Sequence, residues 1–537
     1  MGAFLKSRPQ TPEKLLGACG GFFVFSPFPP TPPKKKMPKL TSLLTLVALT
    51  LLINIASAKP NILFITVDDM SCDSVGAYGC KLPDTTPNMD KLAKSGMKFM
   101  YGHVQVGHCK PSRNVMHSGL YPHTNGVEGF YSHRNSYPML ADLMKQGGYY
   151  TAIRGKITHS TPYTPYPGWD AQLDTVDGKK LHFKDAQSYY TSTKKAIAEA
   201  KKAGKPFCLL SNISDPHKPF YNPKNDPHVP SRVFKADEVP VPGFLHDSPA
   251  VRGELALYYS TVRRGDDAVG ATLRALEESG EKDNTFIFFL SDHGMPLPFA
   301  KTQVYHHSTW TPWIVSWPKH VKPGSVEKDS MVSAIDILPT LLDVAGLKHP
   351  KGLQGRSFLP LLDGEKQKDR DYIVKEYNES AGRTRQPMRA IEDKQYLYIF
   401  NIWSDGKDVF RNATRGTATY REMQKLAPTN EKIAARLKLL DYRVVEELYD
   451  ISKDPDALVN LIDDPEYKNV ADKRRKMLED WMVETKDHAL EPFRKRDDAE
   501  FRRAYIQERV DARKKLEEAE KKAKSPKKSR KTRPEKK

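Results

Sequence analysis

The sequence has few cysteines for its length and no apolar run long enough to cross a bilayer. Five cysteines in 537 residues exclude the dense disulfide framework of a small secreted domain. The apolar run at residues 43–55 falls short of the ~20 residues that span a membrane. No internal repeat is present, so a repeat array is not expected. With 39% hydrophobic residues, the chain can bury one large core and a smaller one.

Positive charge is concentrated at the two ends of the chain. The formal net charge is +19, of which residues 1–58 contribute +6 and residues 513–537 contribute +9. The body between them is nearly neutral, so no nucleic acid is expected as a partner. The low-complexity tail should be disordered past Lys524, as a solubilising segment or as one that holds the protein near polyanions.

Residues 1–58 are predicted to be a leader and signal peptide. A lysine cluster precedes the apolar run, and the small residues Ala56-Ser57-Ala58 follow it as a cleavage site. Cleavage after Ala58 would give a secreted or periplasmic protein with no transmembrane span in the mature chain. An uncleaved anchor is the alternative, and Met37 competes with Met1 as the true start.

After the leader, the cysteines leave one question open. Cys19 would be removed with the leader, and Cys208 sits in an apolar, strand-like run. Cys72 and Cys80 could pair after export, and two buried thiols are the alternative.

Continuous apolar runs alternate with helical patterns from residue 60 onward. Strands are expected at residues 60–67, 149–153, 207–213, 285–290 and 313–316, and helices at 87–95, 139–146, 186–200, 255–278 and 335–345. Apolar strands alternating with helices predict an α/β sheet that is covered on both faces, in a catalytic domain at 59–371.

The pattern changes after residue 371. Strands at 394–403 and 446–450 and an amphipathic helix at 470–485 predict a smaller α+β domain over 372–490. Residues 491–537 are expected to be a charged helical segment that continues into the basic tail.

Polar clusters follow three of the predicted strands. Asp68-Asp69 follows the first, Asp215-Pro216-His217 follows the strand at 207–213, and Ser291-Asp292-His293-Gly294 follows the strand at 285–290. Ligands of open α/β sheets bind outside the carboxyl ends of the strands, so these side chains should meet at one place.

The stretch Cys109-Lys110-Pro111-Ser112-Arg113 begins a predicted helix. Backbone N–H groups and a fixed cation there favour an anion. The stretch resembles the C-x-P-S-R signature of sulfatases, in which the cysteine is oxidised during synthesis to formylglycine, whose hydrate is the nucleophile. The resemblance implies that formylglycine-generating machinery acts on Cys109 before folding.

The resemblance to sulfatases spans residues 59–488. General landmarks of the family are seen at residues 86–93, 333–343 and 447–455. Further stretches resemble the sulfamidase branch, which acts on N-sulfated glucosamine; they lie at 215–218, 292–305, 387–391 and 481–488. The implied fold is a large mixed, mostly parallel sheet sandwiched by helices, like that of alkaline phosphatase and sulfatases, with a smaller C-terminal α+β domain.

The resemblance also implies a divalent cation. Asp68, Asp69, Asp292 and His293 would bind it together with the modified Cys109. Oxygen ligands with one imidazole suit Ca²⁺ best, with Mg²⁺ as the alternative. The fourth ligand is Asn in many sulfatases and His in others.

Five further residues are expected to act on the sulfate group. Arg113, Lys156 and Lys301 would stabilise the charge that develops as the S–O or S–N bond breaks. Lys301 stands where the sulfamidase branch has an arginine. His159 and His217 would carry protons, since the unperturbed pKa of histidine lies near neutrality.

The sequence therefore predicts a sulfatase that hydrolyses sulfate esters or sulfamates of a sulfated carbohydrate, with N-sulfoglucosamine of heparan-type glycans among the expected substrates. Two alternatives stay open at this point. One is a phosphoesterase or phosphonate hydrolase with the same layout, and the other is a glycan-binding protein without activity.

Overall fold

The computed structural model describes residues 59–524 together with Gly21, Val24, Ser26 and Pro27. The predicted signal peptide with its cleavage site, Cys19 and the tail after Lys524 lie outside the described residues. The described residues from Lys59 onward form one compact unit. In that part of the chain, no helix combines the length and the apolar character needed to span a bilayer.

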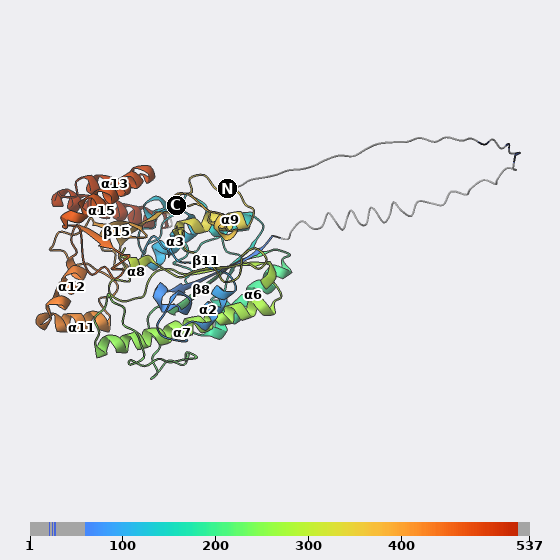
Figure 1. The fold of residues 1–537 in the computed structure, drawn as a ribbon, viewed down its shortest axis with the longest axis horizontal. Helices are drawn as coiled ribbons and strands as arrows, with labels where there is room; N and C mark the ends of the chain where they lie inside the picture. The colour runs from blue at the N-terminus through green and yellow to red at the C-terminus, as the bar shows by residue number, and fades with distance from the viewer. Residues whose placement is uncertain (1–20, 22–23, 25, 28–58, 525–537) are drawn as a thin grey trace, which may run out of the picture. The chain divides into compact units, whose positions relative to one another are not determined.

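A mixed sheet of eight strands forms the centre of the fold (Figure 1). Its order is β11-β2-β10-β9-β1-β8-β4-β5. The strands are β1 (Asn61–Asp68), β2 (Met97–Phe99), β4 (Tyr150–Arg154), β5 (Ala171–Gln172), β8 (Phe207–Pro216), β9 (Thr285–Ser291), β10 (Trp313–Ser316) and β11 (Ser325–Glu327). The central strands β9, β1, β8 and β4 are parallel, and β1 is buried at every position. A continuous apolar run is what a strand covered on both faces requires.

The strand at residues 313–316 has the same apolar pattern as the parallel strands but runs in the opposite direction. β10 pairs antiparallel with β9 and with β2. The connection from β9 stays at the carboxyl edge of the sheet, where Asp292 and His293 lie, instead of crossing back over a face as a βαβ unit does. The chain therefore re-enters the sheet from the same edge and in the opposite direction.

Helices cover both faces of this sheet. Figure 1 shows α2, α6 and α7 on one face and α3 and α9 on the other. The helices of this part are α2 (Pro87–Lys94), α3 (Cys109–Ser118), α4 (Pro122–Asn125), α5 (Leu140–Gln146), α6 (Ala186–Lys202), α7 (Pro249–Glu278), α8 (His306–Thr309), α9 (Ile337–Val344) and α10 (Leu359–Leu362). Helix α7 begins six residues before its predicted start, because Ser248 caps it and Pro249 occupies its first position.

A second, antiparallel sheet follows in the order β13-β14-β15-β16. Its strands are β13 (Tyr372–Glu379), β14 (Arg385–Asp393), β15 (Tyr396–Asn401) and β16 (Glu446–Asp450), and the helices of this part are α11 (Ala418–Leu426), α12 (Glu431–Tyr442), α13 (Lys468–Thr485), α14 (Leu490–Arg494) and α15 (Ala499–Lys524). Buried ion pairs join it to the first part: Arg385 Nη1 lies 2.8 Å from Glu128 Oε2, and His123 Nδ1 lies 2.7 Å from Glu376 Oε2. The division at residue 371 into two domains remains a prediction.

The smaller elements connect these layers. Two short sheets pair β3 (Gly102–His103) with β12 (Val332–Ser333) and β6 (Thr175–Val176) with β7 (Lys179–Lys180). Single 3-10 turns are η1 (Cys72–Ser74), η2 (Gly76–Tyr78), η3 (Lys282–Asn284), η4 (Ala334–Asp336), η5 (Ala427–Thr429) and η6 (Pro465–Tyr467). Cys72 and Cys80 are free thiols, so the possible disulfide between them is absent.

Candidate active site

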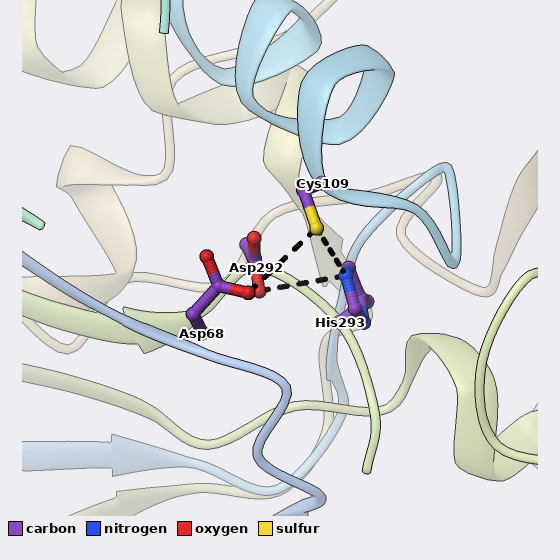
Figure 2. Close-up of side chains that lie close together, drawn as sticks. All are labelled: Asp68, Cys109, Asp292 and His293. Carbon is purple, nitrogen blue, oxygen red and sulfur yellow. Dashed lines mark hydrogen bonds and ion pairs between the residues drawn. The ribbon is translucent and has the colours of Figure 1, made fainter. Parts of the chain in front are cut away.

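Four buried side chains converge at the carboxyl edge of the large sheet: Asp68, Cys109, Asp292 and His293 (Figure 2). One potential ligand atom from each lies within 4.8 Å of the others. The pairing of β1 with β9 explains this proximity, because Val67 lies opposite Ser291 and both strands end at the same level.

Cys109, the first residue of α3, faces this cluster. Its Sγ atom lies 3.6 Å from Asp68 Oδ1 and 3.3 Å from His293 Nε2. The N-terminus of α3 adds backbone N–H groups, so the position favours a negatively charged or strongly polarised group.

Asp69 completes the set of predicted ligands. Its Oδ1 lies 3.2 Å from His293 Nε2, and its backbone N–H donates to Asp292 Oδ1 over 3.1 Å. Asp69 has a left-handed backbone, with φ of 70°, which turns the chain away from the end of β1. Three carboxylates and one imidazole form a donor set that fits Ca²⁺ or Mg²⁺ better than zinc.

Arg113, also a residue of α3, links two of these carboxylates. Its Nη2 lies 3.1 Å from Asp68 Oδ2 and 2.9 Å from Asp292 Oδ2, and its Nε donates to Asp292 Oδ2 over 3.0 Å. The guanidinium is completely buried. Such a charge is held in the protein interior only because these carboxylates surround it.

Two lysines also bind carboxylates of this cluster. Lys156 Nζ lies 2.7 Å from Asp68 Oδ2, and Lys301 Nζ lies 2.7 and 2.6 Å from the two oxygens of Asp69. Lys156 follows Gly155, and both have positive φ. A Cβ atom at Gly155 would lie 2.2 Å from the carbonyl oxygen of Asn212, so only glycine fits there.

These contacts set the protonation states of the ligands. Burial would raise the pKa of Asp68, but Lys156, His217 and Arg113 hold it well below its ordinary value. For His293, burial opposes the proton, yet Asp292 and then Cys109 raise the pKa to about 9. A bound cation would take the place of that proton, because a metal ligand must be the neutral imidazole.

The two predicted proton carriers occupy different positions. His217 lies with Asp68, Asp69 and Cys109 in a group whose ligand atoms are all within 4.8 Å of one another. Its Nδ1 is 2.5 Å from the carbonyl oxygen of Lys218. A carbonyl only accepts, so Nδ1 carries a hydrogen and Nε2 is left to exchange a proton.

His159 stands beside this cluster, outside the groups that could hold an ion. Its ring contacts Phe130 edge to face, with centroids 5.2 Å apart. Burial and then the charge of Lys156 lower the pKa of His159 to about 4. The ring is therefore neutral near pH 7 and can accept a proton.

Sequence reasoning missed the residues that hold Arg113 in place. Arg113 Nη1 donates to Thr66 Oγ1 over 2.7 Å and to Asn212 Oδ1 over 2.8 Å. Thr66 of β1 lies opposite Asn212 of β8. The available signal was a polar residue near the carboxyl end of each strand, Thr66 within the apolar run of β1 and Asn212 among the polar residues that end β8. Ser112 was also missed, and its Oγ donates to the backbone oxygen of Asp292 over 2.7 Å.

The fold and this cluster define a class of hydrolase. A large, mostly parallel sheet carries a buried set of acidic side chains at its edge, beside a helix that begins with a cysteine. The sulfatase family model matches residues 60–347, more than half of the chain. The chain belongs to the sulfatase family, whose members hydrolyse sulfuric esters.

Comparisons with known proteins add relatives that act on sulfated sugars. The model for "N-sulphoglucosamine sulphohydrolase, C-terminal" matches residues 292–411. The chain is 28% identical to human N-sulphoglucosamine sulphohydrolase, over 81% of this chain and 93% of that protein. It is 29% identical to an ulvan-active sulfatase of Formosa agariphila, over 79% of this chain and 80% of that protein.

A solved structure confirms the fold. It is that of a protein in complex with its substrate D-glucosamine-2-N,6-O-disulfate, with a TM-score of 0.60 and 22% identity. The match covers 80% of this chain and 99% of that one. The predicted fold class and the predicted family are both confirmed.

Proposed function

We propose that this protein releases sulfate from a sulfated carbohydrate, by hydrolysing a sulfate ester or a sulfamate, with N-sulfoglucosamine of a heparan-type glycan as the first candidate. The observation that carries the proposal is the convergence of Asp68, Asp69, Asp292 and His293 on Cys109. The relatives named above support a sugar substrate. The chemistry of the proposed reaction needs an anionic substrate, a nucleophile and a proton donor.

The acidic cluster would hold one divalent cation, Ca²⁺ or Mg²⁺. When bound, the cation would withdraw electron density from the sulfate oxygens. Cys109, converted to formylglycine, would supply a geminal diol as the nucleophile, at the N-terminus of α3. We include secretion or export in this proposal, because export would bring such an enzyme to extracellular glycans.

The cations and histidines of this chain then have separate roles. Lys156, Lys301 and Arg113 are fixed by carboxylates before substrate arrives, so they offset the sulfate charge without reorganisation. His217, through Nε2, would donate a proton to the leaving oxygen or nitrogen. His159, neutral near pH 7, would accept a proton from the nucleophile or its adduct.

Matched substrates test this proposal. The purified protein, produced in a host with the formylglycine-generating machinery, would be assayed with a sulfate monoester, a sulfamate and a phosphate monoester of the same alcohol or amine. We expect release of sulfate from the first two to exceed release of phosphate. Faster phosphate release would favour a phosphoesterase, and no release from any substrate would favour a glycan-binding protein.

A further inference from the structure

Lys184 is a buried lysine that contacts the backbone of His217. Its Nζ donates to the carbonyl oxygen of His217 over 2.6 Å and lies 2.5 Å from Asp215 Oδ1. The side chain is only 4% exposed. Lys184 directly precedes Asp185, which caps α6, so it comes from a segment separate from β8 and the turn that follows it. One ammonium group therefore joins the carboxylate at the end of β8 to the carbonyl group of His217.

The carboxylate that binds Lys184 is itself held in place. Arg264 of α7 donates from Nε to Asp215 Oδ2 over 2.7 Å and from Nη2 to Asp215 Oδ1 over 3.3 Å. The same guanidinium binds Asp226 Oδ2 through Nη1 over 2.6 Å. The side chains of Arg264 and Asp215 are each 3% exposed. Charges buried to this extent are held by several partners at once, so the ammonium of Lys184 has a fixed position.

Two further hydrogen bonds of His217 are local. Its backbone N–H donates to the carbonyl oxygen of Ser214 over 3.1 Å, and its ring Nδ1 donates to that of Lys218 over 2.5 Å. These bonds shape the turn and tie the ring to the main chain beside it, but they do not fix the turn relative to the rest of the protein. Among the described residues, the hydrogen bond from Lys184 is the one that joins His217 to a distant segment.

The position of the His217 ring decides whether it can donate a proton to the substrate. One of its ring nitrogens lies within 4.8 Å of potential ligand atoms of Asp68 and Cys109. A general acid must come within hydrogen-bond reach of the leaving atom, and a misplacement of ~1 Å costs about 100-fold in rate. Because the ring is bonded to the adjacent carbonyl group, a shift of the turn would carry Nε2 with it. A contact that fixes the turn therefore also fixes the proton donor.

We propose that Lys184 is a positioning residue for leaving-group protonation, which holds the carbonyl oxygen of His217 so that Nε2 stays within reach of the leaving oxygen or nitrogen. The inference rests on the proposed function, and adds a residue that acts through His217 without touching the substrate. A lysine with a purely structural role would affect all substrates alike. Lys184 should instead affect those substrates whose leaving group needs a proton.

The test uses Lys184→Met with two substrates of the converted enzyme. Met keeps the apolar stem and removes the donor, while Asp215 keeps its bonds to Arg264. The substrates are a sugar sulfate, whose leaving oxygen needs a proton, and 4-nitrophenyl sulfate, whose phenolate leaves without one. The readout is the ratio of kcat for the first to kcat for the second, with KM resolved. This ratio does not depend on the fraction of enzyme that is folded or converted.

Three variants accompany this comparison. His217→Gln gives the ratio in the absence of the proton donor. Lys184→Gln carries a shorter neutral donor that remains compatible with Asp215, and it provides the same comparison if Lys184→Met does not fold. Lys375→Met is the matched control, because it also removes a fully buried ammonium that is bound to a carboxylate, that of Glu392 in the second sheet.

We expect Lys184→Met and Lys184→Gln to lower the ratio by about 10-fold or more through kcat, with KM for the sugar sulfate little changed. Lys375→Met should leave the ratio as in the wild type. If His217→Gln lowers the ratio and the Lys184 variants do not, or if they slow both substrates equally, this inference is overturned alone. If His217→Gln also leaves the ratio unchanged, the role of His217 and this inference fail together. Absence of sulfate release from either substrate by the converted wild type would overturn the proposed function itself.

Discussion

Lys301 and Asp69 are bound to each other by two hydrogen bonds in the buried part of the site, with Lys301 Nζ 2.7 and 2.6 Å from the two carboxylate oxygens. Both side chains are almost completely shielded from solvent. Each charge offsets part of the cost of burying the other. The pair therefore holds one ligand of the proposed cation site in a fixed orientation.

Removal of the lysine charge should destabilise the protein. Lys301→Met leaves Asp69 buried without this partner, so we expect the free energy of unfolding to fall by about 3–5 kcal/mol in metal-free buffer. Lys301→Arg keeps the charge and should cost less, although its planar group does not reproduce the lysine geometry. Urea denaturation measures both, and Lys328→Met, at an exposed lysine, serves as the control. A Lys301→Met protein as stable as the wild type would contradict the role of the pair.

Asp292→Asn tests the proposed cation site. The change keeps the shape of the side chain and removes a negative charge that faces Cys109 and His293, so binding of Ca²⁺ should weaken by about 10-fold or more. Metal content after dialysis and calorimetric titration with Ca²⁺ measure the effect. Asp363→Asn, at an exposed aspartate, should bind like the wild type. Equal affinity of the Asp292→Asn protein would rule this carboxylate out as a ligand.

Replacement of His217 should affect substrates according to their leaving groups. A sugar oxygen needs a proton as it leaves, so His217→Gln should reduce kcat for a sugar sulfate by about 100-fold or more. The phenolate of 4-nitrophenyl sulfate leaves without protonation, so kcat for this substrate should fall much less. His320→Gln, at an exposed histidine, is the control. Equal losses on both substrates would show that His217 is not the proton donor.

His117 should make stability depend on pH. This histidine of α3 is buried, both ring nitrogens lack a partner among the described residues, and burial, with a smaller effect of Arg113, lowers its pKa to about 3. Between pH 3 and 6.5 the unfolded chain binds a proton at this histidine and the folded protein does not. The free energy of unfolding is therefore highest above pH 6.5 and decreases as the pH falls below that value.

The pH effect can be isolated by substitution. Between pH 7 and pH 5, the titration of His117 should lower the free energy of unfolding by about 2 kcal/mol. His117→Met removes the titrating group at similar volume, so the difference in unfolding free energy between wild type and variant should change by that amount over this interval. Urea denaturation at both pH values provides the measurement. A difference that stays constant would show that folding does not lower the pKa of His117.

Much of the site could be predicted because strand ends carry a strong signal. The apolar run before Asp68-Asp69 and the one before Asp292-His293 predict buried parallel strands, and such strands bring the residues after them to one edge. The structure confirms that these residues and Cys109 lie together. Their roles as ligands and nucleophile remain predictions, as do the roles of the lysines and histidines.

Other features depend on contacts that a linear pattern does not contain. The polar residues Thr66 and Asn212 gain meaning only when β1 and β8 pair in a register that puts both against Arg113. The direction of β10 depends on the path of the preceding loop. An apolar run of four residues is compatible with either direction, so its sequence could not decide.

The state of Cys109 provides the most direct test of the whole account. The same preparations would be divided between mass spectrometry of the Cys109 peptide and an assay of sulfate release, with hosts that contain or lack the formylglycine-generating machinery. The account predicts that sulfate release rises in proportion to the fraction of peptide in which an aldehyde replaces the thiol, and that Cys109→Ser releases none catalytically. Full activity from a preparation that contains only the unmodified thiol, or none from a fully converted one, would contradict it.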